Sequence, residues 1–333
     1  MKKYYVNVQG GTGLNICLAS IITAIKETYP DEYKFYVCSP YWDIFESCPA
    51  VDGVYKPQEL RDLVYDAKAN DGVIITQRLY DTNSFIYKLA TYETAWCDLF
   101  GISLPFIEDE NGQGMSVTSK LDPLPKFPYL AQQVADVKKH LKGKKFIITQ
   151  FTGGQSPLVQ VPADKNGQPD WSKVIYNYDN EPLKRHYPTE KAQEFINLFK
   201  QEHPDVEVIA YQLPNEPSYE GTFKFTMPYL TYYLLAKDKD CIGAVTIDSS
   251  LQHLIAGVTK NVVIWAHSIN ASNDGATIYQ NPFGYNYNRN IVQPCRRDDV
   301  LFFSALGPSG AKVEYIAPAE LLNVVDEHLF SKN

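Results

Sequence analysis

The chain has 333 residues, 44% of them hydrophobic and 13% aromatic, which suits two cores of moderate size at roughly 100–200 residues per domain. Its formal net charge of −8 argues against a broadly basic surface for nucleic acid. Six cysteines are scattered without a CxxC pair, which favours reduced core residues in a cytoplasmic protein and argues against zinc. Because no apolar run of about 18 residues and no leader-type segment is present, neither membrane insertion nor secretion is expected.

The first third of the chain alternates between strand and helix patterns. A strand pattern at 4–8 leads into the glycine-containing turn 9–13 and then into a helix whose apolar residues recur every three or four positions. Further strands are predicted at 34–39, 53–55 and 72–76, the last one buried, and helices from 43, over 57–69 and over 84–100, the last ending at Gly101. This alternation predicts a mostly parallel sheet with helices on both faces.

A second series of the same kind follows a break in the pattern at 103–128. Strands are predicted at 145–149, 206–211, 241–246 and 261–265, and helices at 129–141, 188–201, 229–236 and 318–329. The segments 156–183 and 270–297 lack periodicity and are predicted to be irregular excursions over the surface or a cleft. We therefore predict an N-terminal domain over 1–127, a C-terminal domain over 128–315, and a final helix over 316–333 that packs back toward the first domain.

The stretch 245–265 carries most of the functional signal. Asp248 is the predicted N-cap of a helix with an apolar stripe, and Ser250, His253 and Gly257 share the neighbouring small and polar face. Free N–H groups at a helix start favour phosphate. The pattern fits either a ligand-facing helix start or an ordinary capped helix with a buried histidine.

Several segments, in chain order over nearly the whole length, resemble the ADP-heptose lipopolysaccharide heptosyltransferases. Their sugar-donor signature reads Asp, Ser or Thr, Gly, two residues, His, Leu or Ile, Ala, and Asp248–Ala256 is similar to it with Ser250 in place of glycine. Arg185–Pro188 resembles the Lys-[Arg or His]-Trp-Pro segment of that family. Weaker similarities lie at 13–30, 48–55, 96–101 and 316–322. The resemblance implies an α/β GT-B fold, in which two Rossmann-like domains face each other across a central cleft.

The resemblance also implies roles for single residues. A nucleotide sugar would meet Asp248, Ser249, Ser250 and His253. Arg185 would bind its diphosphate in a bidentate way, unless it is a solvated surface charge. Hydroxyl contacts would come from Thr149 and Thr152, unless these only bond within turns. Gly11, Thr12 and Gly13 would line the acceptor side of the cleft.

The main departure from the family lies at Leu14, where the heptosyltransferases carry the aspartate proposed as the base. Leucine cannot accept a proton, so Asp43 or Asp81 is a candidate base and Asn15 a candidate for orienting the acceptor. The resemblance implies inverting sugar transfer to a glycan, a lipid-linked saccharide or a modified base, without a metal or other cofactor. Two alternatives stay open: a phage-type transferase acting on a nucleic-acid base or a protein, and a nucleotide-sugar-binding protein that has lost turnover.

Overall fold

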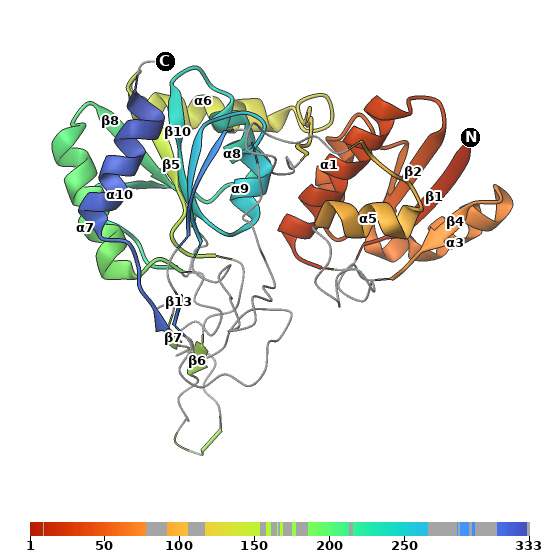
Figure 1. Ribbon diagram of the computed structural model, residues 1–333, viewed down its shortest axis with the longest axis horizontal. Helices are drawn as coiled ribbons and strands as arrows, with labels where there is room; N and C mark the ends of the chain where they lie inside the picture. The colour runs from red at the N-terminus through yellow and green to blue at the C-terminus, as the bar shows by residue number, and fades with distance from the viewer. Residues whose placement is uncertain are drawn as a thin grey trace.

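The chain forms two α/β units, which Figure 1 shows side by side. The computed structural model describes residues 1–8, 10–77, 92–105, 117–153, 158–160, 165, 167–168, 175–177, 186–212, 216–265, 285, 287–292, 295–296 and 312–331. Among these residues, no helix combines the length and apolar character needed to cross a bilayer.

The first unit is a four-stranded parallel sheet in the order β3-β2-β1-β4. Its strands are β1 (Lys2–Asn7), β2 (Tyr33–Cys38), β3 (Gly53–Tyr55) and β4 (Val73–Ile75). Its helices are α1 (Thr12–Thr28), α2 (Trp42–Glu46), α3 (Leu60–Ala69, after a 3-10 turn at Pro57–Glu59) and α5 (Tyr92–Phe100). Side chains of β1 alternate between faces, so Tyr4 packs with α1 and α5 while Tyr5 packs with α3. Gly101 follows α5 with a φ of 61°, as predicted for the residue that ends this helix.

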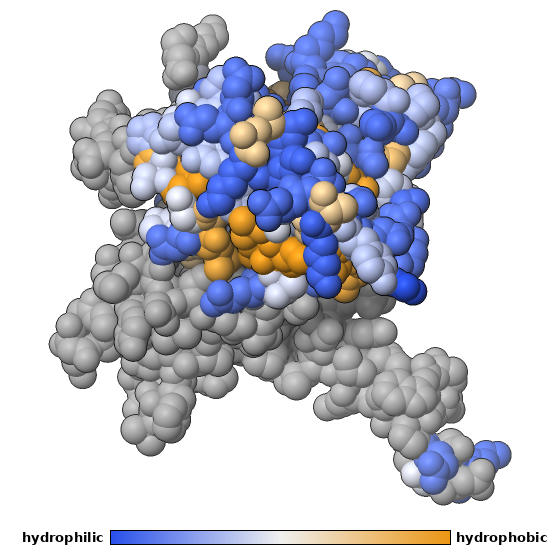
Figure 2. Space-filling view, turned by 90° about the vertical axis from the view of Figure 1, so that its right-hand side faces the viewer, coloured by the Kyte–Doolittle hydropathy of each residue, from blue (hydrophilic) through white to orange (hydrophobic). Residues whose placement is uncertain are grey.

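The strand predicted as buried at 72–76 is instead partly exposed. β4 pairs only with β1 among the described strands, and Val73 and Ile74 are 40% and 36% exposed. Figure 2 views the molecule from the side of the first unit and shows an apolar band across a mostly hydrophilic face. The apolar run at 73–75 therefore belongs to the edge strand of the sheet that the described residues form, and periodicity alone does not distinguish an edge strand from a central one.

The second unit is a six-stranded parallel sheet in the order β12-β11-β10-β5-β8-β9. Its strands are β5 (Lys145–Thr149), β8 (Val206–Ala210), β9 (Phe223–Lys224), β10 (Cys241–Ile247), β11 (Asn261–Trp265) and β12 (Asn288–Val292). In both sheets the first strand is central, the next two lie on one side, and the chain then crosses to the other side. This is the strand order of doubly wound nucleotide-binding sheets.

Regular structure also occurs in the two segments predicted to be irregular. β12 extends the second sheet, and β6 (Leu158–Gln160) pairs with β7 (Ile175–Asn177) in an antiparallel ladder. A further antiparallel pair joins β13 (Cys295–Arg296) to β14 (Lys312–Val313). β12 was not predicted because its five residues are three polar ones followed by two apolar ones, which gives neither an alternating nor a continuous apolar pattern.

Helices cover both faces of the second sheet. α6 (Tyr129–Leu141), α8 (Tyr229–Ala236) and α9 (Ser250–Ile255) lie on the face toward the first unit, and α7 (Thr189–Glu202) and α10 (Pro318–Val325) lie on the other. α10 continues into a π-helical turn at Asp326–Phe330. Leu321 and Val325 of α10 share a buried cluster with Phe195 and Phe199 of α7. The terminal helix thus packs on the second unit, which corrects the expectation that it returns to the first; the domain boundaries at 127 and 315 stay predictions.

Gly243 of β10 lies directly beneath this C-terminal segment. A Cβ added there would come within 2.6 Å of Leu329 Cδ2 and 2.8 Å of the Lys260 carbonyl oxygen. Gly243→Ala is expected to lower the free energy of unfolding by about 1–2 kcal/mol, because one of the two contacts is backbone and cannot move aside. Urea unfolding checks this, and an unchanged midpoint would contradict the packing of residues 326–330 against β10.

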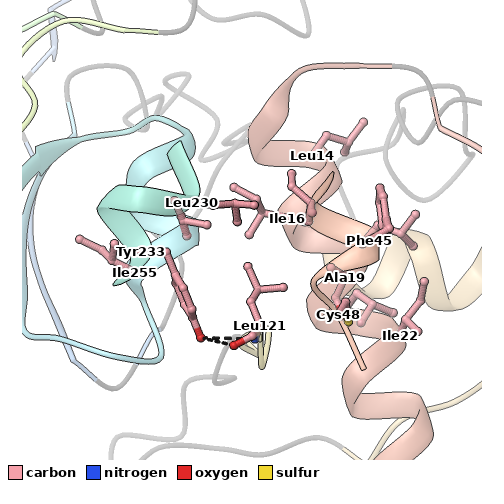
Figure 3. Packing of buried hydrophobic residues seen from close by; sticks show 14 of the residues in the cluster. Leu14, Ile16, Ala19, Ile22, Phe45, Cys48, Leu121, Leu230, Tyr233 and Ile255 are labelled. Carbon is pink, nitrogen blue, oxygen red and sulfur yellow. Dashed lines mark hydrogen bonds between the residues drawn. The ribbon is translucent and has the colours of Figure 1, made fainter. Parts of the chain in front are cut away.

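A hydrophobic cluster continues from the first unit into the second. Figure 3 shows Ile16 of α1 on the side toward Leu230 of α8, and Tyr233 of α8 reaching Leu121 in the segment before α6; Ile255 of α9 belongs to the same cluster. The Tyr233 hydroxyl donates to the Leu121 carbonyl at 3.0 Å and accepts from the Leu121 amide at 3.3 Å.

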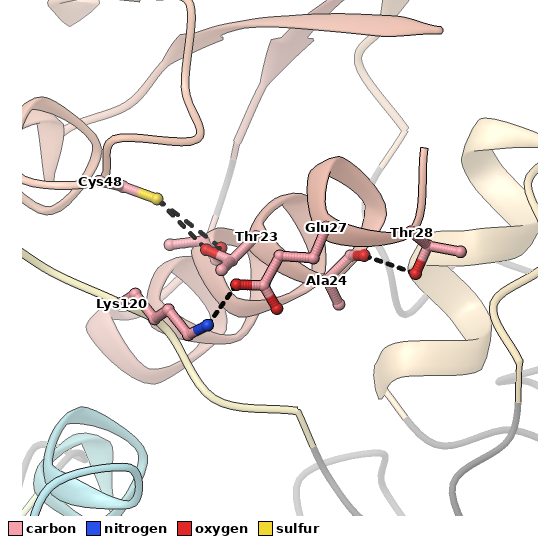
Figure 4. Close-up of polar contacts among 7 residues, drawn as sticks. Thr23, Ala24, Glu27, Thr28, Cys48 and Lys120 are labelled. Atoms are coloured by element: carbon pink, nitrogen blue, oxygen red, sulfur yellow. Dashed lines mark hydrogen bonds and ion pairs between the residues drawn. The ribbon is translucent and has the colours of Figure 1, made fainter. Parts of the chain in front are cut away.

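Polar contacts lie on both sides of α1 (Figure 4). At the solvent-exposed side, Lys120 of the segment before α6 pairs with Glu27 of α1, and inside the first unit the buried Thr23 of α1 contacts the Cys48 thiol. The two units therefore meet across a packed interface that includes α1, α8 and α9.

Candidate functional site

The chain changes direction in the second sheet between β5 and β10. In doubly wound sheets, ligands bind outside the carboxyl ends of the strands at such a point. The segments that follow these two strands lie together here: the Gln150 amide donates to the Val245 carbonyl at 2.9 Å, and the Ser249 hydroxyl donates to Gln150 Oε1. A Cβ at Gly153 would approach Ser249 Cβ to 3.4 Å and Gln150 Nε2 to 2.5 Å, so glycine permits this close approach.

Thr149 and Thr152 lie in the same segment and are each 1% exposed. Neither hydroxyl has a hydrogen-bond partner within the described residues, so the turn-bonding alternative is not realised there. A buried unpaired hydroxyl costs about 1–3 kcal/mol, and such groups in native structures call for an explanation such as a catalytic or binding role.

Asp248 differs from its predicted role as a helix cap. Ser249, with φ −153° and ψ −177°, holds the N-cap position of α9, and its side chain bonds Gln150 instead of the helix. Asp248 is 9% exposed, and its Oδ1 accepts from Gln252 Nε2 at 2.7 Å. Since α9 has only six residues, its dipole is weaker than the predicted longer helix would supply.

His253 lies where α9 meets α1. It is 5% exposed, and its Nδ1 lies 2.8 Å from the Tyr285 hydroxyl. On its other edge, a Cβ at Gly13 would lie 3.1 Å from His253 Cδ2 and 3.6 Å from Ser250 Cα. Gly13 thus allows the two helices to approach closely. Tyr285 also bonds Cys17 of α1, and burial raises the pKa of that thiol well above its ordinary value, so Cys17 stays protonated.

The turn before α1 is held by Asn15. This residue is fully buried; its Nδ2 donates to the Gly11 carbonyl at 2.9 Å, and its Oδ1 accepts from the Ser39 hydroxyl at 2.6 Å. Gly10 has a φ of 135°, which only glycine adopts readily. Gly11 is the exposed N-cap of α1, with Thr12 next to it half-buried. The Asn15 amide therefore ties the end of β1 to the end of β2, and its suggested contact with an acceptor stays a prediction.

Leu14 is 5% exposed and belongs to the hydrophobic cluster of the first unit. Leu14 therefore packs in the hydrophobic core. Asp81 and Arg185 lie outside the described residues. His186, the next residue, is 3% exposed and places Nε2 at 3.2 Å from the carbonyl oxygen of Gly153 in the turn after β5.

Asp43 joins the site from the first unit. It lies on α2, beyond the carboxyl end of β2, and its Oδ1 accepts a hydrogen bond from the Tyr229 hydroxyl at the start of α8. Burial raises the pKa of the Asp43 carboxyl, although bonds from Tyr229 and from backbone amides oppose the rise. Tyr211, directly after β8, bonds Ser250, and burial raises its pKa to about 12.

Sequence reasoning missed three of these residues. Gln150, Tyr211 and Tyr229 carry no motif. Gln150 directly follows the predicted strand 145–149 and Tyr211 ends the predicted strand 206–211, and the carboxyl ends of parallel strands at one edge of a sheet were the available signal.

Two Rossmann-like units with a junction at the carboxyl ends of their strands define the GT-B fold of glycosyltransferases. The chain is similar over 99% of its length to 99% of Escherichia coli ADP-heptose lipopolysaccharide heptosyltransferase II, with a TM-score of 0.56 and 14% identity. It is similar to a glycosyl transferase family 9 structure from Veillonella parvula, with a TM-score of 0.59, 10% identity and 99% and 98% of the two chains covered. The chain is also similar to an E. coli heptosyltransferase with ADP-2-deoxy-2-fluoro heptose, with a TM-score of 0.50 and 11% identity. The similarity covers 98% of this chain and 99% of the heptosyltransferase.

No protein-family model matches the sequence, and no curated protein matches it. At these identities the similarity establishes the fold alone, which is the predicted α/β GT-B architecture.

Proposed function

We propose that the protein transfers a sugar from a nucleotide-diphosphate sugar to a hydroxyl acceptor, with inversion at the anomeric carbon. The supporting observation is the junction of the segments after β5 and β10: the buried hydroxyls of Thr149 and Thr152 have no partner among the described residues, and Gln150, which lies between them in the chain, bonds Ser249. Ligands of doubly wound sheets bind at this position.

In the proposed complex, Thr149, Thr152, Ser249 and Ser250 give hydrogen bonds to the nucleotide sugar, and Arg185 stabilises the departing diphosphate. Such positioned donors act where negative charge develops, so we propose that no metal or further cofactor is needed. An ADP-linked sugar is the first donor to test, because a structural neighbour was solved with an ADP-heptose analogue.

A second candidate is a nucleotide-sugar-binding protein without turnover. Leu14 favours it, because this buried side chain leaves no carboxylate at the place where the heptosyltransferases carry their base. The two candidates share the binding site and differ in whether the sugar–phosphate bond is cleaved.

The test is a panel of ADP-, UDP-, GDP- and CMP-sugars, read by thermal shift and by release of nucleotide with water as acceptor. Both binding and release are expected for at least one donor. Binding without release would support the second candidate, and no thermal shift from any of the four classes would overturn both.

Thr149→Val and Thr152→Val should affect stability and binding in opposite directions. Each removes an unpaired buried hydroxyl, so the free energy of unfolding is expected to stay level or rise by up to about 1 kcal/mol. The Kd of the bound nucleotide sugar is expected to rise about tenfold, which corresponds to about 1.4 kcal/mol. Urea unfolding and calorimetry measure the two quantities.

Thr231→Val is the matched control. Its hydroxyl is equally buried but donates to Gln133 Oε1 at 2.6 Å, so its loss is expected to cost about 1–2 kcal/mol of stability without changing Kd. If Thr149→Val and Thr152→Val behaved like this control, their hydroxyls would be paired within the protein.

A further inference from the structure

Asp43 is the described carboxylate that connects the two units at the site. Tyr229 donates to its Oδ1 from α8, 186 residues away along the chain. Tyr229 lies close enough to Tyr211 for their charges to interact, and Tyr211 bonds Ser250 beside the sugar-donor segment. A continuous line of side chains thus runs from the end of β2 in the first unit to the end of β10 in the second.

In the first unit, this series of side chains begins next to the turn before α1. The Tyr41 amide donates to the Ser39 hydroxyl at 2.9 Å, and Ser39 in turn bonds Asn15 of that turn. Asp43 follows two residues after Tyr41. Asp43 is therefore linked on one side to the glycine turn, proposed to face the acceptor, and on the other, through Tyr229 and Tyr211, to Ser250, proposed to face the sugar donor.

We propose that Asp43 is the catalytic base of the transfer and that Tyr229 is the positioning residue that holds it across the junction between the units. This inference rests on the proposed function, since it assigns a base to that reaction. It removes the need for a carboxylate at position 14.

The proposed transfer forms one bond, breaks one bond and moves one proton. The Asp43 carboxylate takes the proton of the acceptor hydroxyl, and the freed oxygen lone pair forms the new bond to the anomeric carbon. The bond from that carbon to the diphosphate oxygen breaks, and its electron pair leaves with the nucleoside diphosphate. Tyr229 occupies Oδ1, and a carboxylate has about four lone-pair sites, so Oδ2 remains able to receive the proton, which then passes to solvent.

The charges around Asp43 support this assignment. Tyr229 faces it from α8, with Tyr211 and Tyr41 beyond. Within the described part of the chain no cation pairs with Asp43: Lys126 pairs with Glu46 at 3.2 Å, and Lys56 lies over the Trp42 ring at 4.5 Å. A base held by a neutral hydroxyl keeps more of its basicity than one in an ion pair.

The experiment compares wild type with Asp43→Asn, Tyr229→Phe and Tyr233→Phe, using the nucleotide sugar that binds and water as acceptor. Asp43→Asn should lower kcat roughly 10²–10⁴-fold with KM for the sugar donor nearly unchanged. Tyr229→Phe removes a hydrogen bond that favours the charged carboxylate. The pKa of Asp43 therefore rises, and the acidic limb of kcat/KM moves to higher pH, with roughly tenfold lower activity below that limb.

Tyr233→Phe is the matched control, because this tyrosine lies one turn further along α8 and also bonds across the junction, to the Leu121 backbone. It should leave the pH profile in place even if stability falls. Carbon-13 NMR titration of aspartate-labelled protein follows the same pKa without turnover, with Asp43→Asn identifying the signal.

Each outcome decides the inference. Nucleotide release by Asp43→Asn at wild-type rates, or an Asp43 titration that Tyr229→Phe does not move, would overturn it while leaving the proposed function intact. Wild-type protein that binds no nucleotide sugar would overturn both.

Discussion

Phe151→Ala is expected to lower the free energy of unfolding by about 3–5 kcal/mol and to weaken nucleotide-sugar binding at the same time. Phe151 is 1% exposed, and its ring centre lies 5.7 Å from that of Tyr187 and 5.8 Å from those of Phe195 and Tyr219. Truncating a buried phenylalanine removes its transfer free energy and leaves a cavity. Because Phe151 separates Gln150 from Thr152, the cavity opens directly beneath the segment proposed to bind the sugar donor.

Phe199→Ala is the control that separates the loss of stability from the loss of nucleotide-sugar binding. Phe199 belongs to the same buried cluster and is fully buried, but it packs with Phe195, His203 and Phe330 near the C-terminal segment. Phe199→Ala should lower the free energy of unfolding by a similar amount. It should leave the Kd of the nucleotide sugar unchanged at temperatures where both variants stay folded. Equal losses of affinity in both variants would mean that Phe151 acts through general stability alone.

Asn15→Ala is expected to lower the free energy of unfolding by about 2–3 kcal/mol. The change removes bonds to the Gly11 carbonyl and the Ser39 hydroxyl, and leaves the buried Ser39 hydroxyl without its acceptor. We expect kcat to fall as well, since the turn before α1 and the segment leading to Asp43 lose their direct link. Urea unfolding and nucleotide release measure the two effects.

Ser20→Ala is the control on the same helix. Ser20 is also buried, but among the described residues its hydroxyl bonds only the Ile16 carbonyl one turn back, so its loss should cost less than about 1 kcal/mol. A large loss of kcat in Asn15→Ala without any loss of stability would instead favour the role of orienting the acceptor.

Secondary structure follows from the sequence wherever a local signal is strong. The bounds predicted for α6, α8, β5 and β11 are those observed, because proline precedes both helices and both strands are runs rich in apolar residues. β12 was missed because its short, partly polar run lacks such a signal. The cap of α9 was placed one residue early, since Asp248 and Ser249 are equally good N-cap types.

Whether a strand lies at the edge or at the centre of a sheet is likewise not determined by its local sequence. The run at 73–75 is as apolar as that of a central strand, yet β4 has only β1 as a neighbour in the described sheet. The C-terminal helix shows the same limit, because its apolar stripe fits any apolar surface and only the fold places α7 beneath it.

The sequence by itself determined the two α/β series and the positions of their strand ends, because periodicity and turn residues act over a few neighbouring positions. It thereby indicated Thr149, Thr152 and the segment 248–253 as one side of a site. Only the tertiary structure decided what faces them: Gly13 against His253, and Asp43 against Tyr229. These contacts join residues up to 240 positions apart, through the packing of α1 on α8 and α9, and no local pattern encodes that packing.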